Sequence, residues 1–461
     1  MLKLSNHLSG RNIGLLLIVL LSLTLKSCEQ KQALLKFNYE SNYLELTEYF
    51  VKDSLRTLTL DSLSDRKPLR SITLKEVNAF SDKLWNVALA DIESNLVETE
   101  NGTYFGAGQK FGIRIYTRDI SFSGILGVSQ LYPEKILSSL RVTRDIRRRL
   151  GFTVPKGYVV PGIEIDWKEL DMTSIDFLNE NHTNCYTRRT DDVVWLWAAN
   201  DLFDKNPDLA DWEWLYVTGK KFFEEFYNPF FDDSSGLFRG QAAFIDIHYI
   251  DALATGYPKE FSISDCVMIK PLSTNCLYYK GLLAMAHACN KTGRDDEAVY
   301  WNKKAVSLKN AILDGLRNPD GTFAYFMHKD GSLEPRREAL GTALAVITGI
   351  VSGEEAEKCL EGYPVTWAGV PLLHPFYPWK GYYHNNTSWP YVDTFFLWAR
   401  EICEGKDYTG MNAALLARTC IGSGSFHEVV NWTTREPYGS GSQLWSASAY
   451  VNTCIRAGLI D

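Results

Sequence analysis

Two consecutive segments with helical periodicity most strongly limit how this chain can fold. The first, TNCLYYKGLLAMAHAC from Thr274 to Cys289, is apolar on nearly every side of a helix, which predicts a helix that is covered on both sides. The second, RDDEAVYWNKKAVSLKNAIL, places charged residues opposite an apolar stripe, so one of its sides should face water. The stripe consists of Ala298, Trp301, Ala305, Leu308 and Ile312. An inner helix followed by an outer helix predicts a closed double ring of helices.

The rest of the chain after about Val77 continues this alternation of helices and loops. Long alternation of β-branched residues is absent from the sequence, which argues against a large sheet, and the lack of a fixed repeat period argues against a helical solenoid. With the two segments above, the number of predicted helices comes near the twelve that an (α/α)6 barrel requires. The sequence therefore predicts an all-α fold, an (α/α)6 barrel over residues 76–461 with long loops at its mouth. The other predicted helices span 76–95, 121–130, 134–149, 192–204, 209–227, 338–351, 353–361, 388–402, 408–420 and 442–456.

The N-terminus has the features of a bacterial lipoprotein signal. Lys3 and Arg11 precede the apolar run from Ile13 to Leu25, which is too short for a comfortable membrane span. Leu25, Ser27 and Cys28 resemble a lipobox, in which the signal is cut before a cysteine that then receives lipid. We therefore expect residues 1–27 to be removed and Cys28 to tether the protein to a membrane of the cell envelope, with residues 28–75 as a linker and N-terminal layer. A short single anchor helix is the alternative.

Charge and composition limit the kind of partner. The net charge is −8, and loss of residues 1–27 removes three basic residues and no acid. Nucleic acid is an unsuitable partner, because phosphate binding needs clustered Lys and Arg. Aromatic residues make up 13% of the chain, which suits a sugar-binding enzyme but also a large core. Neither His248 nor His384 has a metal-ligand partner at helical spacing, so we predict no metal site and no cofactor.

Two stretches carry acids at the start of a predicted helix. In YTRDISFSG, Arg118 and Asp119 follow Tyr116. Asp119 could cap the helix, or the pair could hold sugar hydroxyls, with the guanidinium donating and the carboxylate accepting. In TRRTDDVVWLW, Asp191 and Asp192 stand together, although one acid is enough to cap a helix. The second acid, beside Trp195 and Trp197, could be held protonated by an apolar wall and act as a general acid.

A third acidic stretch, GSFHEVVNWTTREPYGSGSQLWSAS, lies near the C-terminus. The helix that follows begins near Ser442, so Glu428 stands well before its start and is not its cap. Glu436 is interpreted as a solvated loop acid or as a support for Arg435, and Trp445 as the residue that anchors the loop to the last helix. Three other polar stretches are more often structural when taken singly: the one with Arg239, Asp246 and His248, the helix start at Asn275, and the segment with Tyr383, His384, Asn385, Trp389 and Pro390.

Taken together and in order, these motifs resemble those of (α/α)6-barrel glycosidases over about Phe111 to Gly458. The set YTRDISFSGILGVSQLYPE, TDDVVWLWAANDLF, STNCLYYKGLLAMA, YYHNNTSWPYVD and FHEVVNWTTREPYGSGSQLWSASAY is most similar to glycoside hydrolase family 63, the family of mannosyl-oligosaccharide glucosidase. The resemblance to trehalases, glucoamylases and glycogen-debranching glucosidases is weaker. One departure concerns the residues before the first acid, where relatives often have Gly-Trp or Gly-Met and this chain has Arg189-Thr190.

The resemblance implies an inverting, exo-acting hydrolase of α-linked oligosaccharides, in which two carboxyl groups roughly 6.5–9.5 Å apart act as acid and base. The acid falls on Asp191 or Asp192, with Asp191 preferred as the first of the pair, and the base falls on Glu428. The predicted substrate-binding residues are Tyr116, Arg118, Asp119, Trp195, Asn275, His384, Trp389 and Trp445. Two alternatives stay open. A polysaccharide lyase could use Arg188 and Arg189 to neutralise a uronate, and a noncatalytic surface glycan-binding lipoprotein would keep the aromatic residues without needing the acids.

Overall fold

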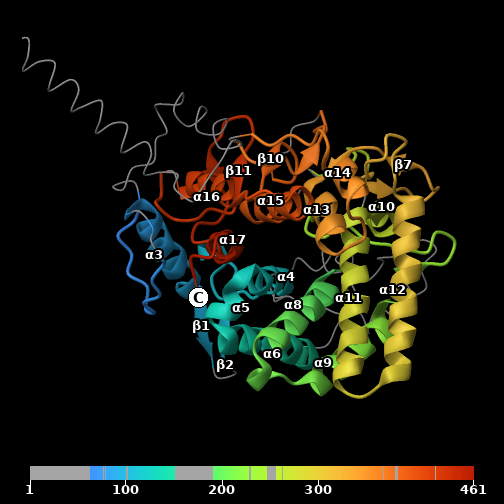
Figure 1. The fold of residues 1–461 in the computed structure, drawn as a ribbon, viewed down its shortest axis with the longest axis horizontal. Helices are drawn as coiled ribbons and strands as arrows, with labels where there is room; N and C mark the ends of the chain where they lie inside the picture. The colour runs from blue at the N-terminus through green and yellow to red at the C-terminus, as the bar shows by residue number, and fades with distance from the viewer. Residues whose placement is uncertain are drawn as a thin grey trace, which may run out of the picture.

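The computed structural model describes residues 63–75, 77, 79–99, 102–150, 190–227, 230–246, 256–261, 263–366, 368–378, 383–420 and 422–460. Cys28 and the predicted signal sequence lie outside these ranges, as do Arg188, Arg189 and His248. Most of the described chain is helical, and its strands are short (Figure 1). Within the described ranges, no helix combines the length and the apolar character that crossing a membrane requires.

Each of the twelve helical segments predicted from the sequence overlaps one of the longer helices. These are α3 (Ala79–Glu93), α4 (Thr117–Ser123), α6 (Pro133–Leu150), α8 (Asp191–Lys205), α9 (Trp212–Lys221), α11 (Leu272–Lys291), α12 (Asp295–Gly315), α13 (Ala339–Ile347), α14 (Glu354–Leu360), α15 (Pro390–Glu404), α16 (Thr409–Ala417) and α17 (Leu444–Arg456). The shorter helices α5 (Ser129–Leu131) and α10 (Ile263–Met268) complete the set in the described residues.

The helices form two series. In the inner series, α4, α8, α11, α13, α15 and α17 contact one another in that order, and α17 also contacts α4. In the outer series, each helix packs against one or two inner helices: α3 against α17, α6 against α4 and α8, α9 against α8 and α11, α12 against α11, α14 against α13 and α15, and α16 against α15 and α17. Figure 1 shows α12 at the edge of the molecule, beside α11. The fold is therefore built from layered helix pairs, as predicted.

The pair α11 and α12 shows how the apolar pattern sets these layers. The buried residues of α12 are Ala298, Trp301, Ala305, Leu308 and Ile312, the same five that form its predicted apolar stripe. Most of α11 is buried on all sides, because α8, α9, α12 and α13 surround it. A helix that is apolar all round gains from burial on every side, whereas an amphipathic helix gains only from one.

The predicted helix over 121–130 is interrupted, which corrects its expected continuity. Helix α4 ends at Ser123, and the chain continues through the π-helical turn η4 (Gly124–Val128) into α5. The break lies at Gly127, whose φ of 104° is unfavourable for other residues. A Cβ atom at this position would lie 2.5 Å from Cδ1 of Ile455. The glycine thus both ends the regular helix and lets α17 approach closely.

The loops between the helices contain short antiparallel strands. They pair as β1 (Leu96–Thr99) with β2 (Gly102–Phe105), β3 (Phe231–Asp232) with β4 (Leu237–Phe238), β5 (Lys270–Pro271) with β6 (Phe326–Met327) and β7 (Leu333–Glu334), β8 (Arg337–Glu338) with β9 (Leu373–His374), and β10 (Thr387–Ser388) with β11 (Val429–Asn431) and β12 (Pro437–Tyr438). In the last sheet Ser388 pairs with Val430. This register places the residues after Glu428 opposite the loop that enters α15.

Candidate active site

The predicted site residues gather at the N-terminal ends of inner helices. Arg118 and Asp119 lie in the first turn of α4, Asp191 is the first residue of α8, Trp389 directly precedes α15, and Trp445 is the second residue of α17. Helix N-termini present free backbone N–H groups and a positive dipole end, which favour acidic side chains and polar ligands. The interpretation of Asp119 as the N-cap of its helix is wrong, because Tyr116 occupies that position.

Arg118 holds two aspartates. Its Nε lies 2.9 Å from Oδ1 of Asp191, and its Nη2 lies 2.9 Å from both carboxylate oxygens of Asp246. The side chains of these three residues are only 8%, 9% and 12% exposed, in that order. Nη1 also donates to the carbonyl of Ala243 at 2.7 Å. A single guanidinium therefore joins α4, the start of α8 and the segment 240–246.

The segment 240–246 crosses the ends of three inner helices. The carbonyl of Ala243 also accepts a hydrogen bond from Oγ1 of Thr190. The N–H of Ala243 donates to Oγ of Ser273 at 3.0 Å. Oγ1 of Thr274 donates to the carbonyl of Gln241 at 2.6 Å. These bonds fix the backbone that carries Asp246. The sequence pointed to this stretch but did not place Asp246 among the site residues, because an aspartate in a loop carries no spacing signal.

Asp192 has a different environment from Asp191. It forms an ion pair with Arg144 of α6, and both side chains are 3% exposed. The Arg144 guanidinium also lies 4.9 Å from the ring centroid of Trp195, whose Nε1 donates to the carbonyl of Leu140. Asp192 and Trp195, three residues apart, share the face of α8 that packs on α6. The first turn of α8 thus directs Asp191 toward Arg118 and gives Asp192 and Trp195 structural contacts in the core.

Glu428 is buried directly before β11 and is 2% exposed. The hydroxyl of Tyr383 donates to its Oε1 at 2.7 Å, and the N–H of Ser440 donates to its Oε2 at 3.0 Å. Burial raises the pKa of this carboxyl, and the two hydrogen bonds and the charge of Lys110 oppose that rise. Glu436 of the same loop is exposed. The two acids of the loop therefore have separate environments.

Tyr383 and Gln443 connect the Glu428 loop to the Arg118 cluster. Burial raises the pKa of the Tyr383 hydroxyl, and the negative charges of Glu428, Asp119 and Asp246 raise it further. Nε2 of Gln443 lies 3.4 Å from Oδ1 of Asp119. The hydroxyl of Tyr383 is thus within electrostatic reach of three carboxylates from different parts of the chain. The structure brings Arg118, Asp119, Asp191 and Glu428 into one site and adds Tyr383 and Asp246 to it.

Aromatic rings form one wall of this site. The rings of His384 and Trp389 stack with centroids 5.5 Å apart, and those of Tyr391 and Trp445 stack at 4.4 Å. Trp389 and Trp445 meet edge to face at 5.6 Å. The buried Nε1 of Trp445 and hydroxyl of Tyr391 have no hydrogen-bond partner among the described residues. Both are donors that a polar ligand could satisfy.

Two further predicted substrate-binding residues, Tyr116 and Asn275, have contacts of other kinds. Tyr116 is half-buried, and its ring meets that of Phe111 edge to face at 5.3 Å. Asn275 is fully buried, and its side chain accepts from the N–H of Phe238 and donates to the carbonyls of Phe238 and Pro271. The Asn275 amide is therefore occupied in joining β4 to the start of α11. A side chain so engaged has little capacity left for a ligand.

Glu338 is a further acid near these helix ends that sequence reasoning missed. It precedes α13 and is fully buried. Burial raises its pKa from the ordinary value of 4.5 to about 8, and the neighbouring donors of Ser273 oppose the rise. At neutral pH this carboxyl therefore keeps its proton. Its position in a strand-to-helix connection, with no second acid nearby in the sequence, gave no signal.

We expect the Glu338→Gln variant to lose much of the pH dependence of stability. The folded state keeps the Glu338 proton up to about pH 8, whereas the unfolded chain releases it near 4.5. The unfolded state binds fewer protons in this window, so the free energy of unfolding of the native protein falls as pH rises through it. Urea unfolding at about pH 5 and about pH 8.5 measures the difference. The exposed Glu436→Gln variant is the matched control, and an equal decline in both variants would contradict the assignment.

No protein-family model and no curated protein matches the sequence. Solved structures do match the fold. A glycosidase variant in complex with glucose superposes with a TM-score of 0.56 at 14% identity, covering 83% of this chain and 98% of that one. The family 63 mannosylglycerate hydrolase of Thermus thermophilus gives 0.57 at 13% identity, covering 80% and 99%. The family 78 rhamnosidase of Bacillus sp. GL1 gives 0.54 at 14% identity, covering 82% of this chain and 35% of that one.

These likenesses show a shared fold. The protein has the fold of the six-hairpin glycosidases, and the predicted resemblance to glycoside hydrolase family 63 is confirmed at the level of the fold. At such identities the likeness does not extend to the reaction, which has to be argued from the site.

Proposed function

We propose that this protein is an inverting glycoside hydrolase that removes sugars from the end of α-linked oligosaccharides. In this proposal the inner helices close into an (α/α)6 barrel, which is supported by the contact of α17 with α4. The observation that carries the proposal is the buried carboxylate of Glu428, whose hydrogen-bond donor Tyr383 is within electrostatic reach of Asp119 and of Asp246, a partner of Arg118. Inversion needs such a pair of carboxyl groups on either side of the cleaved bond.

Glu428 is the proposed general base. Tyr383 and Ser440 each donate to one of its oxygens, which holds the carboxylate in one orientation. Each oxygen keeps a lone pair that can accept a proton from water. Burial raises the pKa of the group, and a base whose pKa is closer to the working pH takes a proton more readily. The carboxylate is therefore both oriented and basic.

Asp191 is the proposed general acid, and Asp246 is the competing candidate. Both carboxylates contact the same guanidinium of Arg118. The resemblance assigns the acid to the start of α8, which favours Asp191. Asp192 forms its ion pair with Arg144 instead.

The charge of the site favours a neutral sugar over an acidic one. Asp119, Asp191, Asp246 and Glu428 are set against the cations Arg118 and Lys110. A uronate would be repelled by the excess of carboxylates. Among the described residues this excess argues against the lyase, whose proposed arginines lie outside those residues. A noncatalytic glycan-binding protein does not need a second buried carboxylate such as Glu428, whose desolvation is costly.

A screen of the purified mature chain against α-linked gluco- and manno-disaccharides tests the function. Release of reducing sugar by the native protein but not by Glu428→Gln supports hydrolysis. Proton NMR of the first-formed anomer tests inversion, which predicts the β-sugar from an α-linked substrate. An α-anomer appearing first would reject inversion, and absorbance of an unsaturated uronate would identify a lyase.

We also propose that Cys28 carries lipid and holds the enzyme at a membrane surface of the bacterial cell envelope. The support is the basic, apolar and lipobox-like order of residues 1–28. Metabolic labelling with a fatty acid should mark the native protein and not Cys28→Ser, and the variant should leave the membrane fraction. Equal labelling of the native protein and of Cys28→Ser would refute the proposed lipid anchor at Cys28.

We expect Gly439→Ala to lower kcat by at least about tenfold, because the substitution disturbs Glu428 directly. Gly439 has a φ of 85°, and a Cβ there would lie 2.5 Å from Oε2 of Glu428. Gly422 is the matched control, since it has the same φ and nothing within 4 Å of the added Cβ. Both alanines carry the backbone cost of about 1–2 kcal/mol. Steady-state kinetics with thermal unfolding separates the two effects, and equal kcat values for the two variants would refute the expectation.

A further inference from the structure

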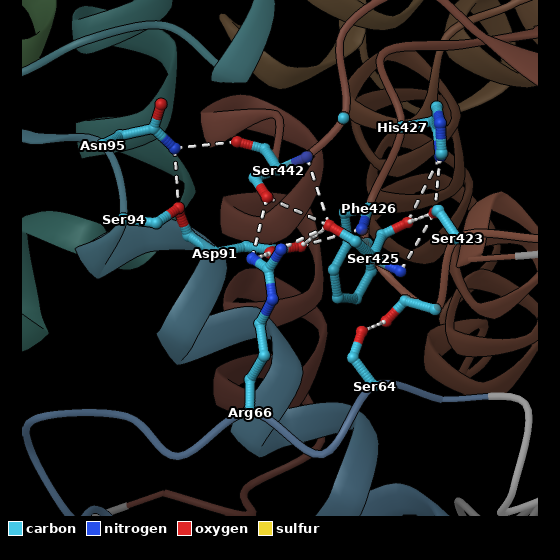
Figure 2. Close-up of polar contacts among 12 residues, drawn as sticks. Ser64, Arg66, Asp91, Ser94, Asn95, Ser423, Ser425, Phe426, His427 and Ser442 are labelled. Atoms are coloured by element: carbon cyan, nitrogen blue, oxygen red, sulfur yellow. Dashed lines mark hydrogen bonds and ion pairs between the residues drawn. The ribbon is translucent and has the colours of Figure 1, made fainter.

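An aspartate of the outer helix α3 binds the loop that carries Glu428. Asp91 is fully buried, and its carboxylate accepts from Oγ of Ser425 at 2.8 and 2.9 Å and from the N–H of Phe426 at 2.8 Å. Nη1 of Arg66 forms an ion pair with it at 2.7 Å. Figure 2 shows Asp91 at the centre of these contacts, between the segment with Arg66 and the loop. Asp91 thus fixes the chain two residues before Glu428.

The same cluster fixes the other end of the loop at Ser442. The N–H of Ser442 donates to Oγ of Ser425 at 3.2 Å, and its Oγ accepts from Nη1 of Arg66 at 2.9 Å. Nδ2 of Asn95 donates to the carbonyl of Ser442 at 2.7 Å and also to the carbonyl of Asp91 (Figure 2). Ser442 has a φ of 44°, a left-handed conformation that a non-glycine residue keeps only where its surroundings hold it.

The two fixed ends lie directly beside the Glu428 carboxylate. Ser440, two residues before Ser442, donates its N–H to Oε2 of Glu428, and its carbonyl accepts from the N–H of Glu428. The N–H of Gln443 donates to the carbonyl of Phe426, which closes the base of the loop. A shift of Ser425 or Ser442 would therefore move both Glu428 and one of the two donors that orient it.

We propose that Asp91 is a positioning residue for the proposed hydrolysis, because it holds both ends of the loop that presents Glu428. The inference rests on the proposed role of Glu428. A buried carboxylate is costly to desolvate, and apolar side chains would join α3 to the loop at lower cost. The carboxylate adds a fixed orientation of the loop, since it accepts hydrogen bonds only from donors that are placed in one arrangement. Ser64 supports the same loop by donating from Oγ to the carbonyl of Gly424 at 2.6 Å.

The test compares Asp91→Ala with Glu401→Ala. Glu401 lies in the last turn of α15, away from the helix ends that form the site. Like Asp91, it forms an ion pair with an arginine, Arg456, and it accepts a hydrogen bond from a backbone N–H, that of Tyr408, at 3.0 Å. Both variants should lower the melting temperature. Only Asp91→Ala should lower kcat, by about 10–100-fold, while KM changes by less than about threefold. Equal kcat values, or a loss of kcat by Glu401→Ala of the same size, would overturn the proposal.

The pH profile and the hydrogen exchange of the loop relative to the rest of the chain separate a loss of anchoring from a general loss of stability. Weakening of the Ser440 donor leaves the Glu428 carboxylate less stabilised, so the acid limb of kcat/KM should move to higher pH in Asp91→Asn. Amide exchange in residues 422–443 should quicken in that variant and stay unchanged in Glu401→Ala. Exchange needs no substrate, so it tests the anchoring even if the native protein hydrolyses none of the sugars. Unchanged exchange and an unchanged pH limb would overturn the proposal.

Discussion

Replacing Glu428 with glutamine should lower kcat by about 10²–10⁴-fold while leaving the fold intact. The amide keeps the size of the side chain and can still accept from Tyr383 or Ser440, but it cannot take a proton from water. Steady-state kinetics on the substrate found in the screen measures the loss, and circular dichroism measures the fold. Glu436→Gln, an exposed acid of the same loop, is the matched control and should keep native kcat.

The pH dependence of activity is a second test of the role of Glu428. Burial raises the pKa of Glu428, and a base must be deprotonated to act. The acid limb of kcat/KM should therefore lie above the ordinary range of a glutamate, and activity should fall as pH drops through it. Near-native activity of Glu428→Gln would show that the base lies elsewhere.

Replacing Asp191 with asparagine should lower hydrolysis of a natural glycosidic bond by about 10²–10⁴-fold. The loss should be much smaller for a substrate with a good leaving group, such as a glycosyl fluoride, because its departure needs no proton. Loss of a general base shows no such recovery, so Glu428→Gln should stay inactive on both substrates. Comparison of the two substrates therefore separates acid from base.

Asp246→Asn decides which partner of Arg118 donates the proton. If Asp191 is the acid, Asp246→Asn should lower kcat equally on both substrates, because it only disturbs Arg118. If recovery on the fluoride follows Asp246→Asn and not Asp191→Asn, the assignment is reversed. Asp192→Asn breaks a buried ion pair with Arg144 and should cost about 3–5 kcal/mol of stability, with native leaving-group dependence in the folded fraction.

Periodicity carried most of the information about helices. The apolar stripe of α12 was read from the sequence residue by residue, and the start of α8 at Asp191 falls within one residue of its predicted position. The break at Gly127 was missed, because the glycine sits in an apolar run and only the approach of Ile455 shows why it is needed. The short strands were also missed, since two or three residues are too few to show alternation.

The site was predicted in part. The sequence separated Glu428 from Glu436, because only Glu428 lacked a structural explanation, and the structure buries it between Tyr383 and Ser440. The sequence left the choice between Asp191 and Asp192 as the general acid nearly even, since both residues stand at the start of the same helix. It also proposed Trp195 and Asn275 for sugar binding, whereas their contacts lie in the core with Leu140 and Phe238.

The sequence by itself determined the helices and the inner and outer places of α11 and α12, because burial imposes a period on residues that are near in the chain. It also singled out the three acidic stretches. Only the tertiary structure decided which acids share a site. Asp191 and Asp246 meet at Arg118, and Asp91 reaches Ser425 across 334 residues. Such contacts join residues that are far apart in the chain, beyond the reach of any sequence period, so their chemistry depends on distances that the packing of the helices sets.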